Sequence, residues 1–197
     1  MSLRERNRHH AKRHTQRTAL ELFEQRGFEA VTVAELAEEV GMAASTIYRH
    51  FETKEAIVLW DEHEADFEKA LLAALGEHPP WEAMRRSAVD ALAHRYDQDL
   101  EFQLRRMKFL YRTPAVHGAA VEADHRDREE LAKALRLVLP REQREAAPLL
   151  AAGALLALEF ALDRWQASGA ELALGALIDT AFEQLGHLAA LGRDERR

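Results

Sequence analysis

Side chains that can form hydrogen bonds are concentrated between residues 44 and 54. Ser45 and Thr46 lie four and three residues before Arg49, so a helix would carry them close to its side chain. Arginine can read guanine in the major groove of DNA, and the methyl groups of threonine and alanine can contact thymine. These residue types therefore indicate recognition of a nucleic acid and not catalysis.

Two short helices with a tight turn between them would position that segment. Thr32 is followed by Glu35, the spacing of a capping box, in which each side chain satisfies a free backbone group at the helix start. Gly41 precedes the second helix, predicted at 44–50, because glycine adopts the positive φ that a sharp helix-to-helix turn needs. The pattern predicts a helix-turn-helix, whose second helix enters the major groove.

Over residues 12–57 the sequence resembles the N-terminal domain of the TetR family of bacterial repressors. The matching residues are Ala19, Leu22-Phe23, Gly27-Phe28, Thr32-Val33, Leu36-Ala37, Gly41, Thr46, Tyr48, His50-Phe51 and Lys54-Glu55. The resemblance implies a three-helix DNA-binding domain and a variable C-terminal domain. Ala43 departs from the family, which often has serine there, and this removes one cap or phosphate contact at the start of the recognition helix.

Ten residues are expected to contact DNA. Thr32 caps its helix, and the resemblance implies that it also meets a phosphate; capping alone is the alternative. Arg49 reads a base or binds a phosphate, and packing is the alternative for His50. Lys54 begins the next helix, whose dipole favours phosphate. The full set is Thr32, Ala44, Ser45, Thr46, Tyr48, Arg49, His50, Lys54, Lys12 and Arg13.

The formal net charge of −7 hides a basic N-terminus. Residues 1–17 hold six basic side chains and one acidic one, whereas residues 18–197 hold 21 basic and 33 acidic side chains. A segment of charge +5 on a body of charge −12 indicates a polyanionic partner, with a solvated tail as the alternative. We expect residues 1–11 to form a basic arm that crosses phosphates or enters the minor groove.

Composition and periodicity predict an all-α fold of about nine helices. The 197 residues include no cysteine, which excludes disulfides, thiolate zinc sites and a cysteine nucleophile. Apolar residues recur every three or four positions, and glycine and proline fall between the periodic runs. The predicted domains are a basic arm at 1–11, a DNA-binding domain at 12–57 and a C-terminal ligand-sensing and dimerisation domain at 58–197.

Individual helices are expected at 12–26, 54–75 and 80–95, and two long apolar ones at 141–166 and 170–191. The longest uncharged apolar run, 146–158, is too short to span a bilayer, and no apolar region of the signal-peptide type opens the chain. A cytoplasmic location without a membrane partner is therefore expected.

The two apolar helices at 141–166 and 170–191 predict a dimer. A helix that is apolar on nearly all sides must be covered on every side, and a second subunit would cover it in a four-helix interface. An intramolecular core helix is the alternative. Twofold symmetry also suits a palindromic operator. The predicted interface residues are Leu155, Leu158, Leu162, Leu174, Leu177, Ile178, Phe182 and Leu185.

Large or adaptable side chains in the C-terminal domain predict a pocket for a small molecule, with ordinary core packing as the alternative. Arg106 belongs to a basic cluster on the helix at 100–111, for which a solvated face is favoured over an anion site. A ligand would shift the population toward a state that releases DNA. The predicted pocket residues are Trp81, Met84, Phe102, Arg106, Met107, Leu110, Tyr111, Phe160 and Trp165.

An enzyme is disfavoured. The chain lacks a P-loop and the Gly-x-Gly-x-x-Gly, His-Glu-x-x-His and Gly-x-Ser-x-Gly motifs. Glu122 and His125 form one Glu-x-x-His pair, but a di-iron site needs two. We predict a homodimeric DNA-binding regulator, a repressor released by a small molecule, without catalytic residues, metal or cofactor. The alternatives are a ligand-independent DNA-binding regulator or architectural protein and, last, a helical-bundle metalloenzyme.

Overall fold

The computed structural model describes residues 2–61 and 64–191 of the chain. Within these ranges the regular structure is helical and no β-strand occurs, which confirms the predicted all-α fold. The helices form two compact units. The first contains Met1–Glu62 and Arg105–Glu122, and the second contains His63–Leu104 and Ala123–Arg197. Residues 105–122, which the sequence placed in the C-terminal domain, therefore pack with the N-terminal helices.

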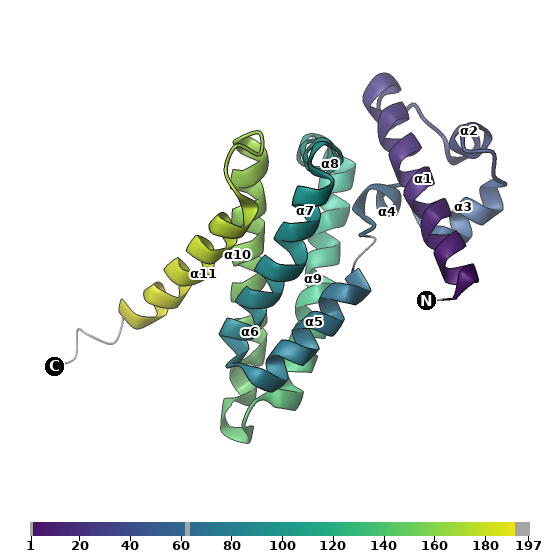
Figure 1. The fold of residues 1–197 in the computed structure, drawn as a ribbon. Coiled ribbons are helices and arrows are strands. Elements are labelled where there is room, and N and C mark those ends of the chain that lie inside the picture. The colour runs from purple at the N-terminus through teal and green to yellow at the C-terminus, as the bar shows by residue number, and fades with distance from the viewer. Residues whose placement is uncertain (1, 62–63, 192–197) are drawn as a thin grey trace. The chain divides into compact units, whose positions relative to one another are not determined.

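The first unit is built on the long helix α1, which contacts α2 and α4 (Figure 1). Its core contains Phe23, Leu36, Ile47 and Ile57, all at most 1% exposed, together with Val116. These side chains come from each of the four N-terminal helices and from α9. The helices of this unit are α1 (Leu3–Arg26), α2 (Val33–Glu39), α3 (Ala44–His50), α4 (Lys54–Leu59) and parts of α8 (Leu100–Arg112) and α9 (Pro114–Val138).

Helix α1 begins nine residues earlier than predicted, so the basic segment is helical. The hydroxyl of Ser2 accepts a hydrogen bond from the backbone N–H of Glu5 (3.2 Å), and the Glu5 carboxylate accepts one from the N–H of Ser2. This capping box starts the helix at Leu3, and the strong helix formers that follow it continue the helix to Arg26. The positive charges of residues 4–17 therefore lie on a helix.

The single helix predicted at 54–75 is divided. Helix α4 ends at Leu59, and α5 begins at Glu64. The carbonyls of Val58 and Trp60 accept hydrogen bonds from two buried side chains, Gln16 and Arg106. Carbonyls held in this way are not available to amides of a continuing helix. The break therefore depends on side chains far away in the sequence.

The second unit is a bundle in which α10 and α11 pack side by side (Figure 1). The helix predicted at 80–95 contains a π-helical segment, and the one predicted at 141–166 begins as a 3₁₀ helix. The helices are α5 (Glu64–Glu77), α6 (Pro80–Ser87), the π-helix η1 (Ala88–Ala93), α7 (His94–Gln98), the 3₁₀ helix η2 (Arg141–Ala146), α10 (Ala147–Ala167) and α11 (Leu174–Leu191), with the remaining parts of α8 and α9.

Helix α11 begins four residues later than predicted because α10 ends in a Schellman motif. The N–H of Ala170 donates to the carbonyl of Trp165 (3.0 Å), and the N–H of Gly169 donates to that of Gln166 (3.1 Å). Both Gly169 and Ala170 have positive φ, which ends the α10 helix. Residues 170–173 therefore form a connection.

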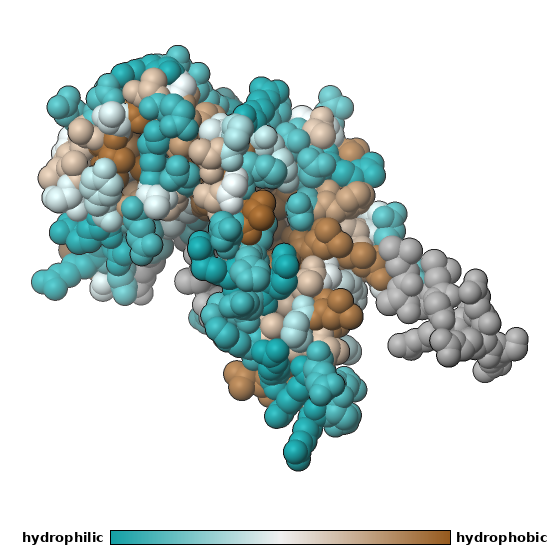
Figure 2. All heavy atoms as spheres, turned by 180° about the vertical axis from the view of Figure 1, so that it is seen from behind, coloured by the Kyte–Doolittle hydropathy of each residue, from teal (hydrophilic) through white to brown (hydrophobic). Residues whose placement is uncertain are grey.

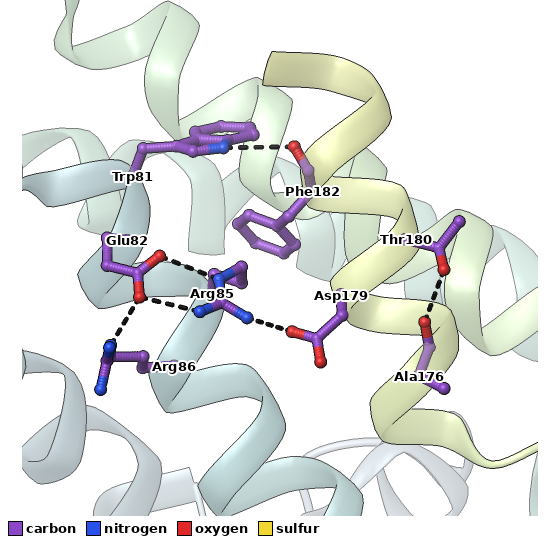
Figure 3. Close-up of polar contacts among 8 residues, drawn as sticks. All are labelled: Trp81, Glu82, Arg85, Arg86, Ala176, Asp179, Thr180 and Phe182. Carbon is purple, nitrogen blue, oxygen red and sulfur yellow. Dashed lines mark hydrogen bonds and ion pairs between the residues drawn. The ribbon is translucent and has the colours of Figure 1, made fainter. Parts of the chain in front are cut away.

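Helix α6 is joined to α11 by a tryptophan and an arginine. The Trp81 indole N–H donates to the carbonyl of Phe182 (3.3 Å), and the two rings lie 4.9 Å apart (Figure 3). A Cβ added to Gly153 would lie 3.3 Å from the Trp81 ring, so α10 and the indole approach each other closely there. Arg85 pairs with Glu82 of its own helix and with Asp179 of α11. The contacts with Arg85 and Arg86 lower the pKa of Glu82 to about 2.

Length and composition alone would allow one segment of the described chain, Arg141–Ala167, to cross a membrane. Core helices of globular proteins pass the same test. In α10 a stripe of small residues is buried inside the protomer, and this stripe consists of Ala147, Ala151, Ala154, Ala157 and Ala161. One face of α10 therefore belongs to the core of the protomer.

Candidate nucleic-acid interface

The turn between α2 and α3 has the geometry that the sequence predicts. Gly41 has a φ of +67°, and its N–H donates to the carbonyl of Glu38 (3.2 Å). The N–H of Met42 donates to the carbonyl of Ala37 (2.9 Å), which completes a Schellman motif. This arrangement stops α2 and turns the chain, and α3 begins after Ala43.

In helix α3 one side chain is buried in the core, and the others are exposed or half-buried. Ile47 is buried against the residues of α2, whereas Tyr48 is 56% exposed. Ser45 and Arg49 are also exposed, and Ala44 and Thr46 are half-buried. The Arg49 guanidinium lies 3.4 Å from the Thr46 hydroxyl. The exposed face of α3 therefore combines a hydroxyl, a phenol and a guanidinium, the donor types that read base edges and phosphates.

The predicted capping box of α2 is present. The Thr32 hydroxyl accepts from the backbone N–H of Glu35 (3.2 Å) and donates to the Glu35 carboxylate (2.8 Å). The carboxylate also accepts from the N–H of Thr32 (2.8 Å) and pairs with Arg26. These bonds, the one from the Thr32 backbone foremost, lower the pKa of Glu35 to about 2. The hydroxyl of Thr32 is thus used by the cap, and a phosphate contact by this residue stays a prediction.

Lys54 is held by the protein itself. Its ammonium donates to the carbonyls of Phe28 (2.6 Å) and Val31 (3.2 Å), and it lies 4.2 Å from the centroid of the Phe28 ring. The side chain therefore ties the start of α4 to the connection between α1 and α2. We interpret Lys54 as a residue that positions the helix-turn-helix, and a phosphate contact by its ammonium stays a prediction.

Basic residues of α1 differ in how far they are available to a partner. The Lys12 ammonium lies over the rings of Phe51 (4.9 Å) and Trp60 (4.5 Å), and Arg13 lies 3.3 Å from a ring nitrogen of His10. Lys12 and Arg13 are half-buried, whereas Arg4, Arg6 and Arg8 are exposed. The first turns of α1 therefore carry its most accessible charges.

His50 combines burial with a strongly cationic setting. Its Nδ1 atom is buried and has no hydrogen-bond partner in the described part of the chain. Burial lowers the pKa of His50, and the nearby charges of Arg8, Arg49 and Lys12 lower it further. The ring is therefore neutral near pH 7, although a phosphate placed beside it would favour the protonated form.

Family models match most of the chain. The family model described as bacterial regulatory proteins of the TetR family matches residues 17–59, and a second model, described as the MftR C-terminal domain, matches residues 78–189. The chain belongs to the TetR family. The family consists of regulatory proteins, and this places the chain outside the enzymes.

Two curated relatives within the TetR family have similar sequences. The transcriptional regulator TcmR of Streptomyces glaucescens is 33% identical over 135 residues, which are 64% of this chain and 58% of TcmR. The uncharacterised regulator YerO of Bacillus subtilis is 42% identical over 43 residues, 22% of this chain and 15% of YerO. The chain therefore matches little more than half the length of TcmR.

Solved structures support the TetR-like fold. FadR of Thermus thermophilus, a repressor solved with lauroyl-CoA, has a TM-score of 0.51 at 21% identity, covering 88% of this chain and 92% of FadR. NalD of Pseudomonas aeruginosa, a repressor of a multidrug efflux pump, has a TM-score of 0.57 at 17% identity, covering 90% of this chain and 94% of NalD. At these identities the likeness concerns the fold alone.

The predicted ligand residues of this TetR-family chain do not all belong to one unit. Trp81, Met84, Phe102, Phe160 and Trp165 belong to the second unit, and Arg106, Met107, Leu110 and Tyr111 belong to the first. Trp165 is buried against Tyr96, with ring centroids 5.2 Å apart, whereas Phe160 is exposed. Leu110 packs against the core of the DNA-binding helices. For Trp165 and Leu110 the structure thus favours the alternative of ordinary core packing.

The predicted interface residues also fall into two groups. Leu174, Ile178 and Phe182 are buried inside the protomer, so for them the structure favours an intramolecular core. Leu155, Leu158, Leu162, Leu177 and Leu185 are only half-buried. An apolar groove of about 230 Å³ lies between α10 and α11, lined by Leu156, Ala157, Phe160, Ala181, Gln184 and Leu185. Figure 2 shows brown patches where hydrophobic side chains reach the surface on this face of the molecule.

Sequence reasoning missed one functional side chain and misplaced another. Gln16 of α1 is buried, because its spacing from Ala19, Leu20 and Phe23 places it on the buried stripe of this helix. A polar residue on an apolar stripe is the signal that would have identified it. The sequence places Arg106 among the pocket residues, with a solvated face favoured for its cluster; it is instead buried and donates to backbone carbonyls at the end of α4.

Proposed function

We propose that the protein is a sequence-specific DNA-binding transcriptional regulator of the cytoplasm. In this proposal it is a homodimeric repressor that binds a palindromic operator and is released by a small molecule. The observation that carries it is the exposed face of α3, where Ser45, Tyr48 and Arg49 point away from a helix that buries Ile47. A helix whose inner face is this well anchored can enter the major groove without losing its place in the domain.

The charge distribution supports duplex DNA as the partner. The basic residues at the start of α1 are exposed and lie on a helix whose Lys12 contacts Phe51, the residue that follows α3. Phosphate contacts from such residues add affinity that falls with salt, and they carry no sequence information. The acidic remainder of the chain repels DNA from other faces, which favours a single docking orientation.

Selection from a random duplex pool followed by fluorescence anisotropy tests the proposal. We expect enrichment of a palindrome whose half-sites are about one helical turn apart, bound more tightly than random duplex at every salt concentration. Affinity should fall linearly on a logarithmic salt scale. A protein that binds all duplexes equally would contradict sequence-specific regulation.

The dimer proposed here places a second copy on the α10–α11 groove. Leu156 and Phe160 are exposed beside the groove, and buried alanines of α10 lie on its other side. Isologous packing of two such surfaces would form a four-helix interface and set two recognition helices at a fixed spacing. Sedimentation equilibrium of the full chain measures this association directly.

Release by a small molecule rests on the fold and on the family. A compound that binds the second unit more tightly in one state than in the other would shift the population away from the DNA-binding state. The low-molecular-weight fraction of a bacterial extract should weaken binding to the selected duplex, and successive fractionation would isolate the compound. Binding that no such fraction changes would favour a ligand-independent regulator.

A further inference from the structure

Three backbone carbonyls at the end of α4 converge on two buried polar side chains. The Gln16 amide nitrogen donates to the carbonyls of Ile57 (3.0 Å), Val58 (3.2 Å) and Trp60 (2.7 Å). Arg106 donates from Nη1 to Val58 (3.4 Å) and Trp60 (3.3 Å). Gln16 belongs to α1 and Arg106 to α8, so two helices hold the same end of a third.

Burial makes these two side chains informative. Gln16 is 5% exposed and Arg106 is 6% exposed. Burying an amide or a guanidinium lowers stability unless the group is hydrogen-bonded, and an apolar residue would fill the same space without that cost. The carbonyls of Ile57 and Val58 lie in the last turn of α4, where a helix has no N–H of its own left to donate to them. The two side chains supply the C-terminal cap that the helix lacks.

The start of α4 is fixed independently. Lys54 binds the carbonyls of Phe28 and Val31, and the Thr53 hydroxyl caps the N–H of Ala56 (3.1 Å). Helix α3 ends at His50, so only three residues separate it from α4. A movement of the α4 end would therefore pass directly to α3, the helix with the exposed polar face.

The two caps differ in strength. Gln16 has two N–H donors for the three carbonyls, and its bond to Trp60, at 2.7 Å, is the shortest of the three. The bonds from Arg106 to Val58 and Trp60 are at the long end of the hydrogen-bond range. A carbonyl oxygen accepts two hydrogen bonds, so the Trp60 carbonyl keeps its bond to Gln16 when Arg106 moves away.

We propose that Gln16 is the permanent cap of α4 and that Arg106 is a releasable latch on it, so that Arg106 sets the position of α3 for DNA. Both are positioning residues that touch no DNA. The inference rests on the DNA-binding function proposed above. Helix α8 belongs to the second unit up to Leu104 and to the first from Arg105, so the latch lies on a helix that both units share.

Arg105 provides a matched control. It is the neighbouring arginine of α8, and its guanidinium pairs with Glu24 of α1 at 2.5 Å. Both side chains of that pair are partly exposed. Arg105→Met therefore removes an arginine and a link between α8 and α1, while the bonds from Gln16 and Arg106 to the α4 carbonyls remain.

The experiment compares Arg106→Met, Arg106→Lys, Gln16→Met and Arg105→Met in the full chain. Anisotropy on the selected duplex at several salt concentrations gives affinity and salt dependence. Hydrogen exchange with mass spectrometry follows the peptide that covers residues 54–61, and a thermal melt reports stability. The exchange measurement needs no DNA, so it tests the caps even where no duplex is preferred.

Arg106→Met should weaken binding about tenfold and speed exchange of the α4 peptide, with a melting temperature close to that of the wild type. The salt slope should not change, because no phosphate contact is lost. The affinity and exchange rate of Arg106→Lys should lie between those of the wild type and Arg106→Met, since one ammonium cannot reproduce the planar arrangement of guanidinium donors. Gln16→Met should also lower the melting temperature, and Arg105→Met should behave as the wild type.

Wild-type affinity and exchange in Arg106→Met would overturn the latch. A lower melting temperature with unchanged affinity would overturn it as well, because that result describes a stabilising residue alone. A reduced salt slope would mean that Arg106 contacts phosphate. A wild-type chain without duplex preference would refute the proposed function, while accelerated exchange in Arg106→Met would still establish that Arg106 holds α4.

Discussion

At the residue scale, the least expected feature of the interface is a histidine surrounded by cations. His50 is the last residue of α3, with Arg8 and Lys12 of α1 and Arg49 of α3 as its charged neighbours. Its Nδ1 is buried without a partner in the described chain, and burial with these charges lowers its pKa. A docked phosphate would reverse the local electrostatic balance and favour protonation.

DNA binding should therefore take up a proton at His50. The free-state pKa is lowered and the bound-state pKa is higher, so affinity should rise as pH falls through the interval between them. Anisotropy at fixed salt from about pH 8 to about pH 6 measures this slope. His50→Gln should flatten the slope by up to one proton, and identical slopes in the two proteins would contradict the assignment.

The capping box of α2 gives a second prediction at this scale. Thr32→Ala should lower the free energy of unfolding by about 1 kcal/mol, because the cap of Glu35 is lost. For a chain of this size this corresponds to about 2–4 °C in melting temperature. Thr180→Ala is the matched control, since the Thr180 hydroxyl donates to the carbonyl of Ala176 within its own helix.

This effect should depend on pH with a defined sign. The folded-state pKa of Glu35, about 2, lies below its ordinary value of 4.5. The stability from this carboxylate is therefore complete above pH 4.5 and disappears as pH falls toward 2. Melts in this acidic range should show a smaller difference between Thr32→Ala and wild type than melts at neutral pH, and a constant difference would exclude the carboxylate as its source.

At the scale of elements, the helix-turn-helix is fixed by contacts between α4, which follows it, and α1, which precedes it. Lys54 joins the start of α4 to the connection after α1, and Gln16 joins the end of α4 to α1 itself. None of these contacts involves the exposed face of α3. Affinity for DNA therefore depends on two kinds of residue, those that touch DNA and those that place α3.

Lys54→Met and Arg49→Met should separate these two kinds. Lys54→Met should lower the melting temperature and weaken binding without changing the salt slope, because its ammonium binds carbonyls of the protein. Arg49→Met should leave the melting temperature unchanged and reduce either the salt slope, by about one contact, or the preference for the selected sequence. A reduced salt slope in Lys54→Met would support the phosphate contact that the family resemblance implies.

What the sequence could predict depends on how local the signal is. Helices α2 and α3 are bounded by a capping box and a glycine turn, so their ends were predictable to within one residue. The start of α1 is marked by the same signal, a capping box of Ser2 and Glu5. The end of α4 depends on Gln16 and Arg106, which are 41 and 48 residues from its carbonyls, and no pattern within 54–75 reveals it.

At the scale of the whole molecule, apolarity alone could not distinguish a core from an interface. Leu174, Ile178 and Phe182 satisfy the periodicity of an interface helix, but the protomer buries them itself. Trp81 of α6 lies against Phe182, a contact between residues 101 positions apart. Leu156 and Phe160 of α10 stay exposed beside the groove, and this is the face on which we propose that the second copy binds.

A charge on that face should dissociate the dimer. Phe160 is 44% exposed and lines the groove between α10 and α11, so Phe160→Glu would place two carboxylates in an apolar interface. Leu137→Glu is the control, since Leu137 of α9 is 82% exposed and lies outside the groove. Sedimentation equilibrium should show a monomer for Phe160→Glu and a dimer for the control. Because both half-sites must be occupied together, Phe160→Glu should also lose most of its affinity for a palindrome while keeping that for a single half-site. A Phe160→Glu protein that remains dimeric would place the interface elsewhere.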